Sequence, residues 1–89
     1  MTLDISKSAR DSLDRLQAKQ YKQVASQILE LLRNDSPNDA RHLSGHPGCK
    51  RIDCGEFRVI YKSVDQVVIV IEVGKRNDDE VYKKFARKA

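Results

Sequence analysis

The sequence predicts an α+β fold in which a curved antiparallel sheet packs on an N-terminal helical hairpin, in the element order β-α-α-β-β-β-α. Apolar residues in the first half recur at three- and four-residue intervals, which is typical of amphipathic helices. The second half contains short runs rich in β-branched residues, separated by turns with glycine, which is typical of strands. A chain of 89 residues has room for one such domain, so we expect residues 1–89 to form a single unit with a modest core.

The first half is expected to contain one short strand and two helices. Thr2–Ile5 alternates weakly between polar and apolar residues and is compatible with a short opening strand. Ser6 or Ser8 can cap a helix that runs to about Leu16. A second helix is predicted over about residues 20–34, and its apolar stripe consists of Tyr21, Val24, Ile28, Leu31 and Leu32. The apolar side of this helical hairpin needs a sheet to cover.

The second half is expected to supply the rest of that sheet. After a loop at residues 38–48, the expected strands are Cys49–Cys54, Phe57–Ser63 and Val67–Val73. Gly55-Glu56, between the first two, is a hairpin signal. The last strand is apolar on both faces except at Glu72, as expected for a central strand, and Gly74 interrupts its pattern. Acidic residues at positions 78–80, followed by basic residues, predict a final helix, because these charges match the helix dipole.

The register of the hairpin predicts which charged side chains share one face of the sheet. If its two central residues form the turn, Asp53 lies opposite Arg58, and Arg51 shares their face. The other face is mostly apolar and should meet the helices. Arg76 and Tyr82 follow the last strand and could close around the charged face. Solvated charges on an exposed sheet are the plainer interpretation of the same register.

Composition limits the classes of protein to which the chain can belong. The formal net charge of +4 is compatible with a nucleic acid partner, but it is also common among proteins without one. The longest apolar run, Val67–Ile71, is much shorter than the ~20 residues of a membrane-spanning helix. The N-terminal residues do not resemble a secretory signal. We therefore expect a cytoplasmic protein that does not bind membranes.

Two cysteines and two histidines lie close together in the sequence but do not predict a metal site. Cys49 and Cys54 belong to one expected strand, where five residues separate them by about 16 Å and place them on opposite faces. That distance is too long for a disulfide. The set also contains no Cys-x-x-Cys pair that would anchor a metal ion. We expect no metal and no cofactor.

Four short motifs occur in order along the second half of the chain. They are LSGHPGCKRI at residues 43–52, GEFRVIY at 55–61, VGKR at 73–76 and EVY at 80–82. Together they resemble the RelE/ParE superfamily of bacterial and archaeal toxins, and most of all its RelE branch. The resemblance implies a fold similar to that of microbial ribonucleases. It also implies cleavage of mRNA in the ribosomal A site, without metal, by attack of a ribose 2′-hydroxyl on the neighbouring phosphate.

The resemblance implies catalytic roles for individual residues. Arg51 and Arg58 match basic residues of the family that stabilise the phosphate, for which the planar guanidinium fork is suited. Arg76 matches the arginine credited with protonating the leaving 5′ oxygen. Tyr82 matches the C-terminal aromatic residue, which can stack on a base or orient a hydroxyl. The family's general base is a lysine, and this chain has Asp53 there. Asp53 either accepts the proton itself or pairs with Arg58 and lowers the positive potential.

Further basic residues are candidates for weaker contacts with RNA or the ribosome. They are Arg41, Lys50, Lys75 and Lys83. His46 has a side chain that titrates near neutrality, which makes it a conceivable acid or base, but its place in the loop favours a role in shaping that loop.

The resemblance also implies partners and leaves two alternatives open. A toxin must be silenced in its own cell, so a cognate antitoxin, RelB-like or of another family, is expected to wrap it by folding on binding. The ribosome and mRNA are the other expected partners. The alternatives are an inhibitor of DNA gyrase without enzymatic activity, like the ParE branch, and a family member that has lost catalysis at Asp53.

Overall fold

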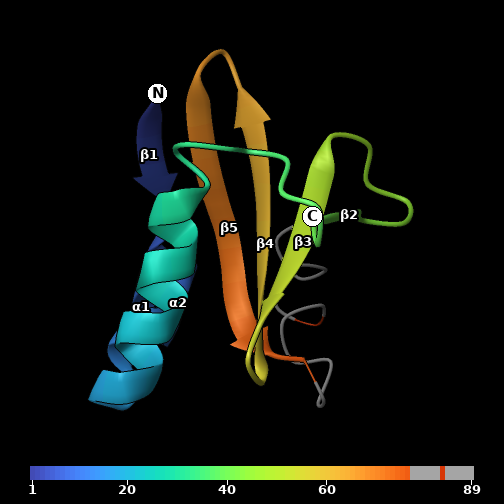
Figure 1. Cartoon of the computed structure of the whole chain (residues 1–89). Coiled ribbons are helices and arrows are strands. Elements are labelled where there is room, and N and C mark those ends of the chain that lie inside the picture. The colour runs from blue at the N-terminus through green and yellow to red at the C-terminus, as the bar shows by residue number, and fades with distance from the viewer. Residues whose placement is uncertain (77–82, 84–89) are drawn as a thin grey trace.

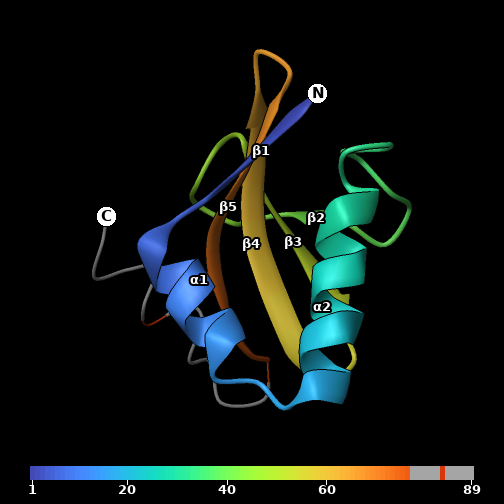
Figure 2. The ribbon, with the colours of Figure 1, turned by 90° about the vertical axis from the view of Figure 1, so that its left-hand side faces the viewer.

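The computed structural model describes residues 1–76 and Lys83. This part of the chain forms a five-stranded sheet with two helices on one of its faces (Figures 1 and 2). The elements are β1 (Thr2–Ile5), α1 (Lys7–Asp14), α2 (Ala18–Glu30), β2 (Arg41–His42), β3 (Cys49–Cys54), β4 (Phe57–Val64) and β5 (Val67–Lys75). The predicted α+β class and helical hairpin are confirmed. The predicted final helix lies outside the described residues.

Helix α1 begins at a serine cap, and both helices end in tighter turns. The Oγ of Ser6 accepts a hydrogen bond from the backbone N–H of Ala9 at 3.0 Å. The same hydroxyl donates to the carbonyl of Ile71 at 2.6 Å, so the cap also fastens α1 to β5. Both helices end a few residues before the predicted positions. The residues that follow them bond to the carbonyl three residues back, as in the contact of Leu31 N–H with Ile28, and so continue as tighter turns.

The sheet is mixed, with strand order β1-β5-β4-β3-β2. Three of its four strand pairings are antiparallel, as predicted, whereas β1 departs from the prediction and pairs parallel with β5. The loop predicted at residues 38–48 contains the two-residue strand β2, because that segment pairs with the edge of β3. Gly74 was expected to interrupt the last strand but lies within β5, where it pairs with Arg58.

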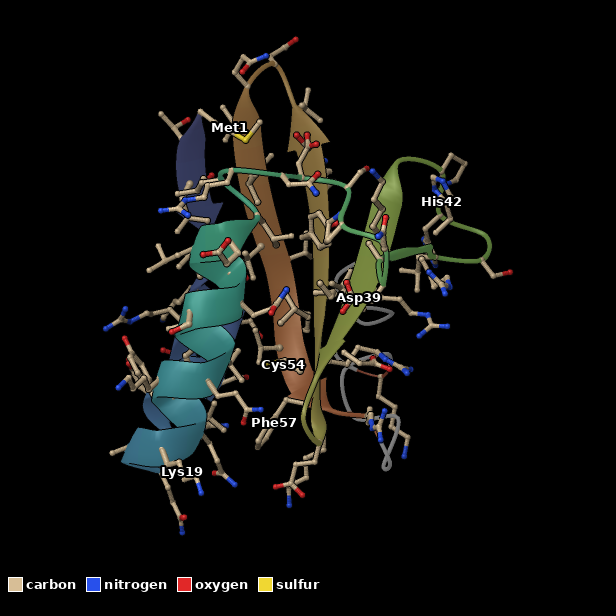
Figure 3. All side chains as sticks on the ribbon, viewed as in Figure 1. Met1, Lys19, Asp39, His42, Cys54 and Phe57 are labelled. Carbon is tan, nitrogen blue, oxygen red and sulfur yellow. The ribbon has the colours of Figure 1, made fainter. Side chains whose placement is uncertain are left out.

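The β3–β4 hairpin has the predicted register. Asp53 lies opposite Arg58, and Cys54 lies opposite Phe57 across the turn. Gly55 has a φ of 61°, the left-handed conformation that a glycine adopts without strain in such a turn. Figure 3 shows the side chains of Cys54 and Phe57 on the side of the sheet that faces α2. Arg51, Asp53 and Arg58 therefore lie on the face away from the helices.

The main core fills the space between the helices and the sheet, and a smaller cluster lies on the opposite face. Val70 and Val73 both belong to the main core although they are three positions apart, a spacing that places residues of a regular strand on opposite faces. The β4–β5 pairing shifts register between Ile60 and Tyr61, and this irregularity brings both side chains to the same face. Ile60 is fully buried in the smaller cluster. Glu72, the predicted exception in this strand, is also fully buried and accepts a hydrogen bond from the hydroxyl of Ser8 at 2.7 Å.

Candidate active site

Asp53 and Arg58 form a two-pronged ion pair on the sheet face away from the helices. The Nε of Arg58 donates to Oδ1 of Asp53 at 2.6 Å, and its Nη2 donates to Oδ2 at 3.1 Å. Two parallel hydrogen bonds of this kind fix both the distance and the orientation of a guanidinium group. The Arg58 side chain is only 16% exposed, so the carboxylate also compensates for the partial burial of its charge.

Two more arginines approach the same carboxylate. Arg51 precedes Asp53 by two positions on β3, so their side chains share a face, and its Nη1 lies 4.0 Å from Oδ1. Arg76 follows β5, and its backbone N–H donates to the carbonyl of Glu56 at 3.0 Å, which holds it beside the hairpin turn. Its Nη1 lies 3.4 Å from Oδ2. We call this set the arginine cluster: Arg51, Asp53, Arg58 and Arg76.

The arginine cluster is cationic at neutral pH, because three guanidinium groups surround one carboxylate. The hydrogen bond from Arg58 lowers the pKa of Asp53 below its ordinary value of 3.8, and this effect exceeds that of burial, which by itself raises the pKa. Arg76 and Arg51 lower the pKa further. The Asp53 carboxylate is therefore ionised at neutral pH.

Strand β2 brings a further cation to this face of the sheet. Arg41 pairs directly with Arg51, so the two side chains lie side by side on one face. The guanidinium group of Arg41 donates to the carbonyls of Asn38 and Ala40 at 2.8 and 3.0 Å, which holds it at the edge of the sheet. The sequence pattern did not reveal this neighbour of Arg51, because a two-residue strand is too short to show alternation.

The segment between α2 and β2 is tied to the helix-facing side of the sheet. The Tyr61 hydroxyl donates to the backbone carbonyl of Asp35 at 2.9 Å, and the Ser63 hydroxyl donates to the Asp35 carboxylate at 2.6 Å. Burial raises the pKa of Tyr61 to about 12, so the donated proton remains in place. Lys50 donates to the Ser36 hydroxyl in the same region. Lys50 is thus held away from the arginine cluster.

The remaining predicted residues lie apart from the cluster or outside the described part of the chain. Lys75 pairs with Phe57, which belongs to the helix-facing core, so its side chain lies on the opposite face from Arg58. Lys83 is exposed. Tyr82 lies outside the described residues, so its distance to the cluster stays a prediction.

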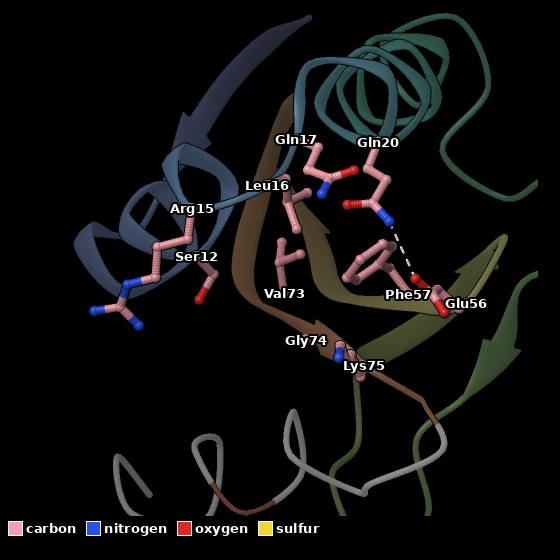
Figure 4. Close-up of a pocket in the computed structure, with 10 residues that line it drawn as sticks. All are labelled: Ser12, Arg15, Leu16, Gln17, Gln20, Glu56, Phe57, Val73, Gly74 and Lys75. Carbon is pink, nitrogen blue, oxygen red and sulfur yellow. Dashed lines mark hydrogen bonds between the residues drawn. The ribbon is translucent and has the colours of Figure 1, made fainter.

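A pocket of about 380 Å³ lies near Lys75, between the α1–α2 connection and the ends of β4 and β5 (Figure 4). Leu16, Phe57 and Val73 form its apolar part. A hydrogen bond of 3.1 Å from the Gln20 amide to the Glu56 carboxylate crosses one side of it. The pocket is thus on the helix side of the sheet, whereas the arginine cluster is on the other side.

The two cysteines lie apart, and the described residues form no metal-binding group. Cys54 belongs to the main core, where its thiol donates to the carbonyl of Gln23 at 3.4 Å, whereas Cys49 packs with the smaller cluster on the opposite face. The predicted separation of the two thiols is confirmed. Over residues 1–76 and Lys83, no three His, Cys, Asp or Glu side chains gather in a way that could hold a metal ion. The described helices are also too short or too polar to cross a membrane.

Comparisons with known proteins agree with the motifs of the second half. Residues 3–80 match the family model described as the ParE toxin of type II toxin-antitoxin system, parDE. The chain is also 32% identical, over 91 aligned positions, to the mRNA interferase toxin RelE of Escherichia coli K12, covering 97% of this chain and 94% of that protein. The chain is a RelE-like toxin of the RelE/ParE superfamily.

Solved structures support the same placement of this RelE-like toxin. The isolated E. coli RelE toxin superimposes with a TM-score of 0.75 at 27% identity, covering 98% of this chain and 96% of that one. RelE in the intact E. coli RelBE toxin-antitoxin complex superimposes with a TM-score of 0.73 at 28% identity, covering 83% and 94%. The fold predicted from the resemblance is therefore confirmed over nearly the whole length of these relatives.

Proposed function

We propose that this RelE-like toxin is an endoribonuclease of a type II toxin–antitoxin pair, and that it cuts mRNA in the ribosomal A site without a metal ion. The convergence of three arginine side chains on one face of the sheet carries the proposal. The names of two relatives support it, because the RelE proteins of E. coli and Shigella flexneri, both 32% identical, are called mRNA interferases.

In the proposed reaction, a ribose 2′-hydroxyl gives up its proton to the solvent and attacks the neighbouring phosphorus. The bond to the 5′ oxygen breaks and that oxygen takes up a proton, which leaves a cyclic phosphate and a free 5′-hydroxyl. Negative charge builds up on the phosphate oxygens in the transition state. Arg51 and Arg58 are suited to stabilise that charge, and Arg76 is suited to donate a hydrogen bond to the leaving oxygen. Tyr82 would orient the hydroxyl or stack on a base.

Basic residues outside the arginine cluster would contribute to the binding of RNA or the ribosome. Arg41 continues the cationic face beyond Arg51, so it is the best placed of the additional candidates for an RNA phosphate. Lys50 and Lys75 would contact the RNA backbone or the ribosome from other surfaces, and the exposed Lys83 is a further candidate for such a contact. We infer that residues 1–89 act as one domain, and that the protein acts in the cytoplasm, where its ribosomal substrate is.

The partner that silences the toxin would be an antitoxin. A relative at 28% identity was solved as the E. coli RelBE toxin-antitoxin complex, which supports a RelB-like partner for this chain. Co-expression of the toxin with its neighbouring small acidic reading frame, followed by purification of one through a tag on the other, tests this part of the proposal. Failure of every flanking frame to co-purify or to relieve growth arrest would contradict it.

The activity is tested with purified protein, ribosomes and a defined mRNA, and the new 5′ ends are mapped by primer extension. We expect cuts at fixed positions within codons that depend on ribosomes. Arg51→Ala should abolish most of the cutting. Arg33→Ala, which removes the same charge from an exposed position after α2, should leave it intact.

The same preparations should be assayed for gyrase supercoiling. Loss of supercoiling with intact mRNA would favour the ParE-like alternative. This alternative has one observation in its favour, because the matching family model is named for ParE. If neither mRNA nor gyrase is affected, the chain is a member that has lost catalysis.

A further inference from the structure

We propose that Asp53 is a positioning residue that holds the guanidinium groups of the arginine cluster together, and that it does not accept the proton of the 2′-hydroxyl. This inference rests on the proposed function, because it assigns a role within the same site. It separates two interpretations of Asp53 that the sequence leaves equal, and it concerns a residue that stands where known RelE proteins carry a lysine.

Both oxygens of the Asp53 carboxylate already accept hydrogen bonds from arginines. Oδ1 accepts from Nε of Arg58 at 2.6 Å, and Oδ2 accepts from Nη2 of the same group at 3.1 Å and from Nη1 of Arg76 at 3.4 Å. A general base must come within hydrogen-bond reach of the proton that it removes. A 2′-hydroxyl that approached Asp53 would have to come in among these guanidinium donors, and a proton transferred to the carboxylate would weaken the contacts that hold the cations near the phosphate.

The exposure of the three arginines divides them into an inner and an outer set. Arg58, held by the two-pronged contact, is 16% exposed, whereas Arg51 and Arg76 are 32% and 45% exposed. The two outer groups each approach the carboxylate through a single nitrogen. Arg58 is therefore the innermost arginine, fixed by Asp53, whereas Arg51 and Arg76 lie further out, where they could contact a phosphate.

The negative charge of the Asp53 carboxylate allows the three guanidinium groups to lie close together. Three guanidinium groups within a few ångströms of one point repel each other, and a negative charge between them offsets that repulsion. The same contacts lower the pKa of Asp53, which makes the carboxylate a weaker base. Asp53 is therefore well suited to hold the three arginines in place and poorly suited to accept a proton.

The experiment compares Asp53→Asn and Asp53→Glu with the parent protein, with Asp65→Asn as the matched control. Asp65 lies exposed in the β4–β5 turn at a φ of 51°, which asparagine tolerates, and its substitution changes the net charge by the same amount. Two quantities are measured: the NMR signal of the Arg58 Nε–H group in the free protein, and the pH dependence of kcat for ribosome-bound mRNA.

For Asp53→Asn we expect the Arg58 Nε–H signal to move to the position of a solvated arginine, and kcat to fall about 10- to 100-fold, the effect of losing a charge-assisted contact. KM should not rise, because a negative charge has left the site. The pH profile should stay parallel to that of the parent. Asp53→Glu, which retains the charge and both oxygens, should restore the signal and most of kcat. Asp65→Asn should resemble the parent in both measurements.

Other results would overturn the assignment. If Asp53 were the base, hydroxide would replace it in the Asp53→Asn variant, and the logarithm of kcat would rise with pH over a range where that of the parent stays level. An unchanged Arg58 signal in that variant, or an unchanged kcat, would also contradict the positioning role. The NMR measurement needs no substrate, so it tests the arrangement of the cluster even if the parent protein does not cut mRNA and the proposed function fails.

Discussion

Replacing Arg76 by alanine should separate catalysis from stability more sharply than any other change in the arginine cluster. Its side chain is 45% exposed and meets Asp53 through one nitrogen at 3.4 Å. An exposed ion pair of this kind contributes less than about 1 kcal/mol to the free energy of unfolding. The backbone N–H of Arg76, which donates to the Glu56 carbonyl, is retained by alanine. We therefore expect almost no loss of stability.

The expected loss of activity is much larger. Removal of one preorganised donor to a transition-state oxyanion raises the barrier by about 2.7–4 kcal/mol, which corresponds to a 100- to 1000-fold lower rate. Arg76 is one of three cations in the cluster, and it alone follows β5 and is fixed to the Glu56 carbonyl in the hairpin turn by its backbone. The loss should appear in kcat, since the leaving oxygen carries its charge only in the transition state.

The assay combines primer-extension mapping of ribosome-bound mRNA with urea unfolding of the same preparations. The Arg33→Ala variant serves as the control for loss of a positive charge. Cutting by Arg76→Ala at more than about a third of the parent rate would refute the reasoning, because that corresponds to less than 1 kcal/mol of transition-state stabilisation. A midpoint of unfolding that falls in parallel with activity would refute it as well.

Three further predictions concern stability, pH and metals. Tyr61→Phe should lower the free energy of unfolding by about 1–2 kcal/mol, because the partly buried carbonyl of Asp35 loses its donor, and a lower urea midpoint at constant slope would verify this. The lowered pKa of Asp53 adds stability above its ordinary value of 3.8, and this stability is lost as the pH falls through the folded value. The stability difference between parent and Asp53→Asn should therefore be present at about pH 7 and shrink as the pH falls below about 4. A difference that persists in acid would contradict this linkage. Cleavage should continue with phenanthroline, which removes transition metals but leaves ribosomal magnesium, and full inhibition would point to a metal ion in the reaction.

The sequence predicted the part of the site that depends on local geometry. A two-residue turn fixes the register of the strands on either side, so the pairing of Asp53 with Arg58 followed from the position of Gly55 alone. The side chains of Arg51 and Asp53 share a face for the same reason, since residues two apart on a strand point the same way. Local spacing was therefore sufficient for three of the four members of the arginine cluster, Arg51, Asp53 and Arg58.

The remaining features depend on contacts between distant segments. The contact of Arg76 with Asp53 joins residues 23 positions apart, and the parallel pairing of β1 with β5 joins the two ends of the described chain. Alternation of apolar residues in Thr2–Ile5 carries no information about strand direction. The glycine at position 74 was interpreted as a break because glycine is rare in strands, but pairing on both sides keeps it within β5. These features could therefore be recognised only in the assembled sheet.

The parallel pairing of β1 with β5 also sets the order in which the molecule can assemble during synthesis. Thr2–Ile5 leaves the ribosome first, yet its partner Val67–Val70 is made more than sixty residues later. The hairpin of β3 and β4 can close in the meantime, because its strands are neighbours in the sequence. Arg76 comes directly after β5, so the last cation arrives when the sheet is otherwise ready. The arginine cluster is thus complete only after β5 and Arg76 have been made.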